Sequence, residues 1–71
     1  MPLYYFKLVD GRIVTDYGVH ELADDTVAQI EAIKLARSVR EARPDLVGQR
    51  CSISVTVEGG AGICIIPLEV S

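Results

Sequence analysis

The residue types found in catalytic and metal sites gather in one stretch of this sequence, between positions 16 and 25. His20 is the single histidine, and an imidazole beside a carboxylate such as Asp16 or Glu21 can act as a general base. The same stretch holds a cluster of carboxylates, formed by Asp16, Glu21, Asp24 and Asp25. Carboxylate oxygens are the ligands that hard divalent cations prefer, so a cation site is one interpretation of this cluster.

The positions of Asp24 and Asp25 favour a different role. Both precede a long amphipathic segment, where an aspartate caps a helix by accepting a backbone N–H and lies at the positive end of the helix dipole. Thr26 with Gln29 has the spacing of an alternative capping box. We therefore interpret the cluster as helix capping, with cation binding as the alternative, and expect His20 to be a solvated connector residue. The sequence predicts no catalytic residue, no cofactor and no metal ligand, and hence a protein that is not an enzyme.

Two other groups have the composition of binding sites. The run Tyr4-Tyr5-Phe6 is aromatic enough for a base-stacking surface, but Lys7 and Arg12 are the basic residues beside it, so we expect two of the three rings to be in the core. Gly59-Gly60 with Gly62 is typical of a phosphate loop. However, it lies between two predicted strands and opens no helix, so we interpret it as a turn.

One amphipathic helix, Asp24 to about Arg43, is the element around which the chain is arranged. Its apolar residues recur at three- and four-residue steps and form one stripe. The stripe consists of Ala28, Ala32, Leu35, Ala36, Val39 and Ala42. Alanines let a helix lie close to a sheet, while Leu35 and Val39 supply most of the bulk. Pro44 marks the end, because proline disfavours helical backbone at the preceding residue.

A hairpin is predicted on each side of the helix. Residues 2–9 have the composition of a strand, Asp10-Gly11 is typical of a type I′ turn, and a short strand is expected over about 12–16. This turn would place Leu8 opposite Ile13, on the face covered by the helix. Strands at about 50–57 and 62–70 form the second hairpin, with Val55 opposite Cys64.

These elements predict a single α+β domain over residues 1–71, with order ββαββ. The sheet should have four mainly antiparallel strands, with the helix packed on one face. Pro67 cannot donate to a ladder, which places the fourth strand at an edge and favours the strand order 2-1-3-4.

The register of the second hairpin also predicts the state of the two cysteines. Cys51 and Cys64 both point inward, but they are four residues apart along the ladder, at roughly 13 Å. A disulfide needs Cα atoms within about 7 Å. We therefore expect two buried thiols that do not pair and that react slowly, because burial raises the pKa of a thiol.

The composition limits the functions that the chain can have. Its net charge is −3, which argues against nucleic-acid binding because affinity for phosphate backbones comes mainly from clustered Lys and Arg. No apolar run has the length needed to span a bilayer, and no signal peptide precedes the first strand. We expect no membrane association and a cytoplasmic location.

A second set of apolar residues lies outside the predicted core. Ile30 and Ile33 lie away from the helix stripe, and other such residues occupy outward positions of the first and fourth strands. These outward residues are Leu3, Tyr5, Val9, Ile63 and Ile65. A sheet covered by one helix has one open face, and this face is too apolar to be left in water. We expect a homodimer formed through the open face, an edge strand or the Ile30/Ile33 side of the helix.

Several short motifs are spread over nearly the whole chain. They are Pro2-Leu3-Tyr4-Tyr5-Phe6, Asp10-Gly11, Asp16-Tyr17-Gly18, Glu21-Leu22, Ala28, Glu31-Ala32, Ala36-Arg37 and Ile66-Pro67-Leu68. In combination they resemble a family of short bacterial proteins classed as a domain of unknown function. The resemblance implies an α+β fold and no particular activity, cofactor or site residue. A more distant similarity, in arrangement alone, is to HicB-type antitoxins.

The sequence therefore predicts a small non-enzymatic interaction module that acts as a homodimer and binds a protein partner. The alternative is a regulator that binds a small molecule or nucleic acid, as an antitoxin-like protein would, in a cleft between two subunits.

Overall fold

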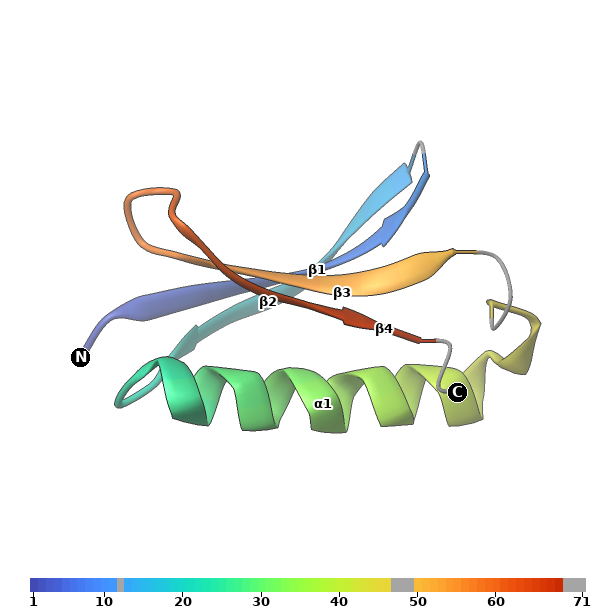
Figure 1. Cartoon of the computed structure of the whole chain (residues 1–71), viewed down its shortest axis with the longest axis horizontal. Helices are drawn as coiled ribbons and strands as arrows, with labels where there is room; N and C mark the ends of the chain where they lie inside the picture. The colour runs from blue at the N-terminus through green and yellow to red at the C-terminus, as the bar shows by residue number, and fades with distance from the viewer. Residues whose placement is uncertain (12, 47–49, 69–71) are drawn as a thin grey trace.

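The structure is a computed structural model that describes residues 1–11, 13–46 and 50–68. Its elements are β1 (Leu3–Asp10), β2 (Ile13–Glu21), α1 (Asp25–Ala42), the short 3₁₀ helix η1 (Pro44–Leu46), β3 (Cys51–Val57) and β4 (Gly62–Pro67). The strands form one antiparallel sheet with the order β2-β1-β3-β4, and α1 lies across one face (Figure 1). The predicted fold class and strand order are confirmed. The parts of the strand predictions that fall on Arg12 and Val70 lie outside the described residues.

The helix begins and ends where the sequence predicts. Asp24 is the N-cap, and its carboxylate accepts the backbone N–H of Val27 at 3.0 Å. At the other end the N–H of Arg43 donates to the carbonyl of Val39 at 2.7 Å. The guanidinium of Arg43 then binds the carboxylate of Asp45 through two hydrogen bonds of 3.1 and 3.0 Å, which fixes the chain as it leaves the helix.

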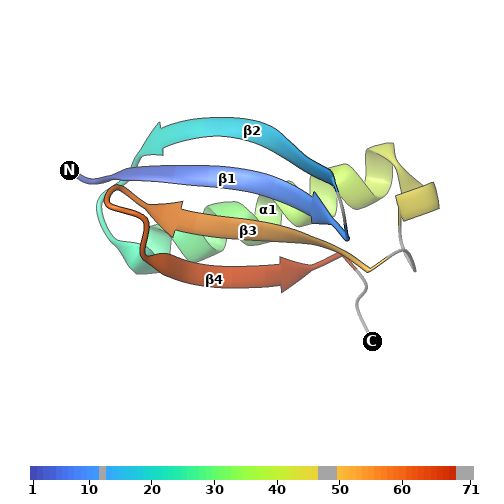
Figure 2. The same ribbon diagram turned by 90° about the horizontal axis from the view of Figure 1, so that it is seen from above.

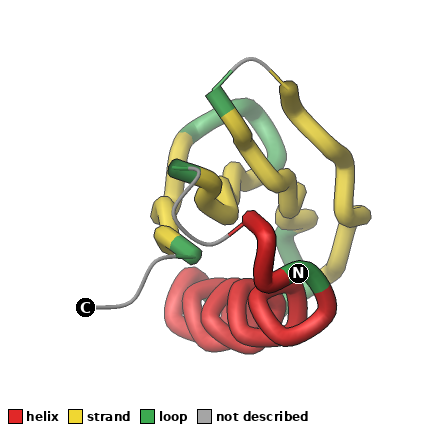
Figure 3. The backbone as a smooth tube through the Cα atoms, turned by 90° about the vertical axis from the view of Figure 1, so that its right-hand side faces the viewer, coloured by secondary structure: helices red, strands yellow, loops and turns green. Residues whose placement is uncertain are grey.

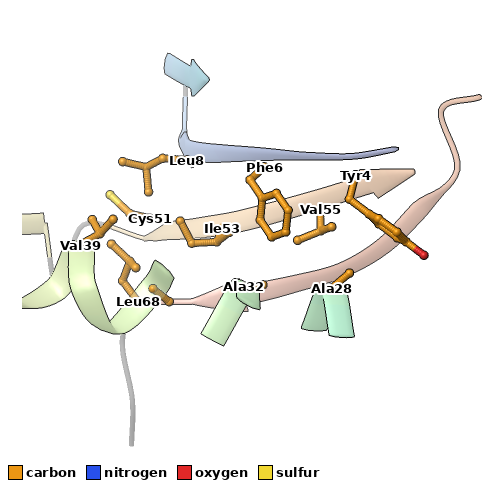
Figure 4. Packing of buried hydrophobic residues seen from close by; sticks show 11 residues of the cluster. Tyr4, Phe6, Leu8, Ala28, Ala32, Val39, Cys51, Ile53, Val55 and Leu68 are labelled. Atoms are coloured by element: carbon orange, nitrogen blue, oxygen red, sulfur yellow. The ribbon is translucent and has the colours of Figure 1, made fainter. Parts of the chain in front are cut away.

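The core lies between α1 and the inner faces of β1 and β3 (Figure 4). The helix contributes small side chains, since Ala28 and Ala32 are fully buried, and the sheet contributes the bulk. The remaining buried residues are Tyr4, Phe6, Leu8, Ala36, Val39, Cys51, Ile53, Val55 and Leu68. The prediction for Ala42 is wrong, because the last turns of α1 emerge from under the sheet and leave this residue exposed (Figure 2). Leu35 is only partly buried for a related reason, since α1 packs mainly against β3 and β4.

The first hairpin differs from its prediction in both register and length. Leu8 lies opposite Thr15, and Asp10 lies opposite Ile13, so Asp10 belongs to the strand. The reason is tertiary, because Asp10 also pairs with Cys51 of β3, which extends β1 by one residue. Ile13 is on the predicted face but is 62% exposed, since the helix does not cover this part of β2.

β2 continues past the predicted end at Asp16 because it contains a bulge. The ladder shifts by one residue between Tyr5 and Lys7, where two residues of β2, Tyr17 and Gly18, lie opposite the single residue Phe6. Gly18 has φ +110°, a backbone conformation that favours glycine, and its N–H donates to the Asp16 carboxylate at 2.8 Å. The expected connector from Val19 is therefore strand up to Glu21.

The second hairpin has the predicted register. Val55 lies opposite Cys64, Ile53 lies opposite Ile66, and Pro67 is in the edge strand. A shift of the ladder near Gly62 adds one residue to β4. Ile63 is consequently half-buried and packs against the core, so its predicted place on the open outer face is wrong.

Candidate interaction surfaces

The carboxylates around the helix entry bind neighbouring groups of the protein separately. Asp24 caps the helix as predicted, Asp25 accepts a hydrogen bond from the Tyr4 hydroxyl at 2.7 Å, and Asp16 accepts the Gly18 N–H. Glu21 is an exposed residue at the end of β2, opposite Leu3. Within the described part of the chain, no group of three or more His, Cys, Asp or Glu residues is placed to hold a metal ion. The capping interpretation is therefore confirmed for Asp24, whereas Asp25 lies in the first turn of the helix and binds Tyr4 instead.

The bond between Tyr4 and Asp25 ties β1 to the start of α1 and has a measurable pH dependence. The hydrogen bond to the Asp25 carboxylate, with burial of the ring, raises the pKa of Tyr4 from 10.0 to about 12. Because the pKa is higher in the folded state, this bond contributes its full stability below pH 10 and loses it as pH rises toward 12. We expect the free energy of unfolding of Tyr4→Phe to fall less steeply between about pH 10 and pH 12 than that of the natural protein.

Urea unfolding at a series of alkaline pH values measures this effect. Tyr5→Phe is the matched control, because it also removes one phenol, from the outer face of the same strand. The proposed role of the bond is wrong if Tyr4→Phe and Tyr5→Phe show the same pH profile.

His20 is exposed, as predicted, but it lies in β2 rather than in a connector. It is opposite Tyr4, and its ring contacts that of Phe6 edge-to-face, with centroids 5.4 Å apart. Among the described residues it forms no hydrogen bond or ion pair with Asp16 or Glu21. This geometry makes His20 a packing residue at the margin of the core.

The thiols of the second hairpin do not form a disulfide. Cys51 is buried as predicted, whereas Cys64 is only partly buried. Burial raises the pKa of both thiols, and the carboxylate of Asp10 raises that of Cys51 further. Both groups are therefore weak nucleophiles at neutral pH.

The outer face of the sheet carries apolar residues that lie next to one another. Tyr5 of β1 is opposite Val19 of β2, and Val9 is opposite Val14. Val14 and Val19 are 58% and 47% exposed. Sequence reasoning missed Val19 because it ended β2 at Asp16; the glycine at position 18 was the available signal of a bulge. It missed Val14 because the predicted register places this residue opposite Lys7 rather than Val9. Leu3 extends the surface at one end of β1.

Two more apolar groups are exposed elsewhere. Ile30 and Ile33 are 48% and 47% exposed on the helix, as predicted. Ile65 on β4 is 68% exposed, and it lies across from Ser54 of β3. Polar residues of β3 therefore separate Ile65 from the apolar surface over β1 and β2.

Two grooves flank the helix. One, of about 270 Å³, lies between α1 and β2 and is lined by Phe6, Tyr17, His20, Glu31, Lys34 and Leu35. The other, of about 210 Å³, lies between α1 and β4 and is lined by Ile33, Ala36, Arg37, Arg40, Ile66 and Pro67. Figure 3 shows the single helix lying beneath the curved sheet.

No helix in the described residues is long and apolar enough to cross a membrane. Comparison with known proteins gives one result, a match of residues 3–69 to the model of a family described as a domain of unknown function, DUF6894. No curated protein and no solved structure matches the chain. The matched range includes all four strands and the helix. This chain therefore belongs to the DUF6894 family, whose function is unknown.

Proposed function

We propose that this chain is a small non-enzymatic interaction module that acts as a homodimer. The observation that carries the proposal is the apolar character of the outer face over β1 and β2, where Tyr5 lies against Val19 and Val9 against Val14, on either side of the charged pair Lys7 and Asp16. An antiparallel sheet with a helix on one face normally exposes polar residues on the other. Here that pattern holds on β3, with Ser52, Ser54 and Thr56, and fails at the apolar positions of β1 and β2.

The size of the molecule favours the sheet face over the helix as the dimer interface. A specific interface buries about 800 Å² on each partner. The whole molecule measures about 35 × 22 × 18 Å, so an interface of this size needs a broad face such as the outer face of the sheet (Figure 2). Ile30 and Ile33 form a narrower ridge, with Glu31 and Lys34 beside them in an ion pair at 3.7 Å. This ridge is the second candidate interface.

A dimer would also compensate for the small core. A chain of this length buries only about 60% of its unfolded surface, and its fully buried side chains on the helix are alanines. Association removes further apolar surface from water and stabilises the folded state as protein concentration rises.

Sedimentation equilibrium over a wide concentration range tests the proposal. We expect a mass of twice the 7.7 kDa of one chain at micromolar concentrations, with dissociation on dilution. A mass of 7.7 kDa at every concentration would contradict the homodimer.

A further inference from the structure

The two edge strands of the sheet, β2 and β4, differ in how well they are protected against pairing with a further strand. β4 is six residues long, is shifted near Gly62 and contains Pro67, which cannot donate to an added strand. β2 is nine residues long and contains neither Pro nor Lys, the residues that most often prevent pairing at an edge. Its bulge at Tyr17 and Gly18 is a partial protection. β2 is thus the edge that can accept a further strand.

β2 is also exposed on both faces. Every residue of this strand except Gly18 is exposed, including large apolar side chains. Ile13 is 62% exposed and Tyr17 is 38% exposed, in addition to the two valines of the outer face. A long apolar edge strand with open backbone groups is a site for pairing with another chain.

A groove lies directly beside this edge. Because α1 packs mainly on β3 and β4, it leaves the 270 Å³ groove between itself and β2. Phe6 and Leu35 give the groove an apolar floor, and Tyr17 and His20 form its wall on β2. In peptide recognition by strand addition, backbone hydrogen bonds give affinity and pockets for alternate side chains give specificity. β2 and its groove provide both parts.

The charges around β2 select the type of strand that fits. Asp16 and Glu21 lie on β2 itself, and Glu31 lines the groove. Among the described residues, the basic groups nearby are Lys34, which binds Glu31 at 3.7 Å, and Lys7, which lies across the ladder from Asp16. Arg43 also lies near Tyr17, but its charge is paired with Asp45. Acidic groups therefore exceed basic ones, in a chain with a net charge of −3. Two copies of β2 paired with each other would bring two sets of Asp16 and Glu21 into one ladder, which is unfavourable.

We propose that β2 binds an extended, basic segment of a partner protein as a fifth strand of the sheet. The segment alternates apolar and basic side chains, so that one apolar side chain enters the groove over Phe6 and Leu35 while lysine or arginine points to the outer face, near Asp16 and Glu21. The inference rests on the proposed role as an interaction module, but it uses the edge of the sheet rather than the dimer face.

A labelled synthetic peptide tests this site. The probe is a capped eight-residue peptide that alternates lysine and valine, and its counterpart alternates glutamate and valine. Fluorescence anisotropy should show binding of the lysine peptide and at least about fivefold weaker binding of the glutamate peptide, since like charges oppose pairing across a ladder. In NMR spectra of the labelled protein, the lysine peptide should shift and protect backbone amides of β2 and not those of β4.

A matched pair of variants locates the binding site. Tyr17→Lys adds a positive charge to the β2 edge, and Ile65→Lys adds the same charge to the β4 edge. We expect the first to weaken binding of the lysine peptide at least about fivefold and the second to leave it unchanged. Val14→Lys replaces Tyr17→Lys if the latter does not fold.

The experiments distinguish a failure of strand addition at β2 from a failure of the proposed homodimer. Absence of binding, equal binding of both peptides, or shifts confined to β4 would overturn strand addition at β2. Protection of β2 amides that rises with protein concentration in the absence of peptide would also overturn it, because a second copy would then occupy the edge. In each case the sedimentation mass tests independently whether the chain is a homodimer.

Discussion

Ile53→Ala is expected to lower the free energy of unfolding by about 2–5 kcal/mol, the usual range for truncating a fully buried isoleucine. Ile53 has no solvent exposure and lies in the central part of the sheet, between β1 and β4 and above the helix. Three of the four buried residues of α1 are alanines, whose short side chains cannot extend into the space left by the removed atoms. The cavity should therefore persist.

For a domain this small such a loss is close to the whole stability, because the core of a chain below about 70–80 residues rarely supplies more than about 3–5 kcal/mol. Urea denaturation at a fixed protein concentration measures the change, with circular dichroism as the signal. Ser54→Ala is the control on the same strand, because Ser54 points to the outer face. We expect it to change stability by less than about 0.5 kcal/mol. Equal effects of the two substitutions would show that the core is not centred on Ile53.

Tyr5→Glu is expected to weaken the homodimer by about a hundredfold or more, since an unpaired charge buried in an interface costs about 3–5 kcal/mol. Tyr5 lies at the centre of the apolar surface, between Val19 and Thr56. Sedimentation equilibrium of the variant should give the monomer mass at concentrations where the natural protein is a dimer. Ile65→Glu, at the more distant edge of the same face, should have a smaller effect.

Ile30→Glu and Ile33→Glu are the matched changes on the helix. If the outer face is the interface, both variants keep the mass of the natural protein. If instead they dissociate the dimer while Tyr5→Glu does not, the ridge formed by Ile30 and Ile33 is the interface. Circular dichroism must show that every variant remains folded, because loss of the fold also reduces association.

The two proposed surfaces meet on β2 without being the same. The outer face of this strand belongs to the dimer surface through Val14 and Val19, whereas its backbone edge and inner side adjoin the groove. A homodimer formed through the outer face would leave two β2 edges accessible. Each dimer would then offer two copies of the strand-addition site, which increases the effective affinity for a partner with two such segments.

The elements with strong local signals were predictable from the sequence alone. The helix begins at Asp24 and ends before Pro44 because the capping aspartate and the proline act within one turn of the backbone. The register of β3 and β4 follows from the alternation of Cys51, Ile53 and Val55, since a shift of one residue would expose the whole apolar set. The edge position of Pro67 follows from its missing N–H.

Tertiary structure determined the register and the length of the first hairpin. The local turn signal at Asp10-Gly11 predicted a register that the pairing of Asp10 with Cys51 overrides, because a longer ladder on β3 holds Asp10 in the strand. The bulge at Gly18 then returns Val19 to the outer face and turns His20 inward against Phe6. The sequence around Asp10 and Gly18 gives no signal of the pairing of Asp10 with Cys51 or of the contact between His20 and Phe6.

By itself, the sequence determined the α+β order, the helix bounds and the apolar excess, because periodicity, capping and hydropathy are local properties. Only the tertiary structure decided which apolar residues remain outside the core. One helix lies over β3 and β4 and cannot also cover β2, so Ile13 is exposed although its face was predicted correctly. The position of one helix on a four-stranded sheet therefore creates both the exposed edge and the groove beside it.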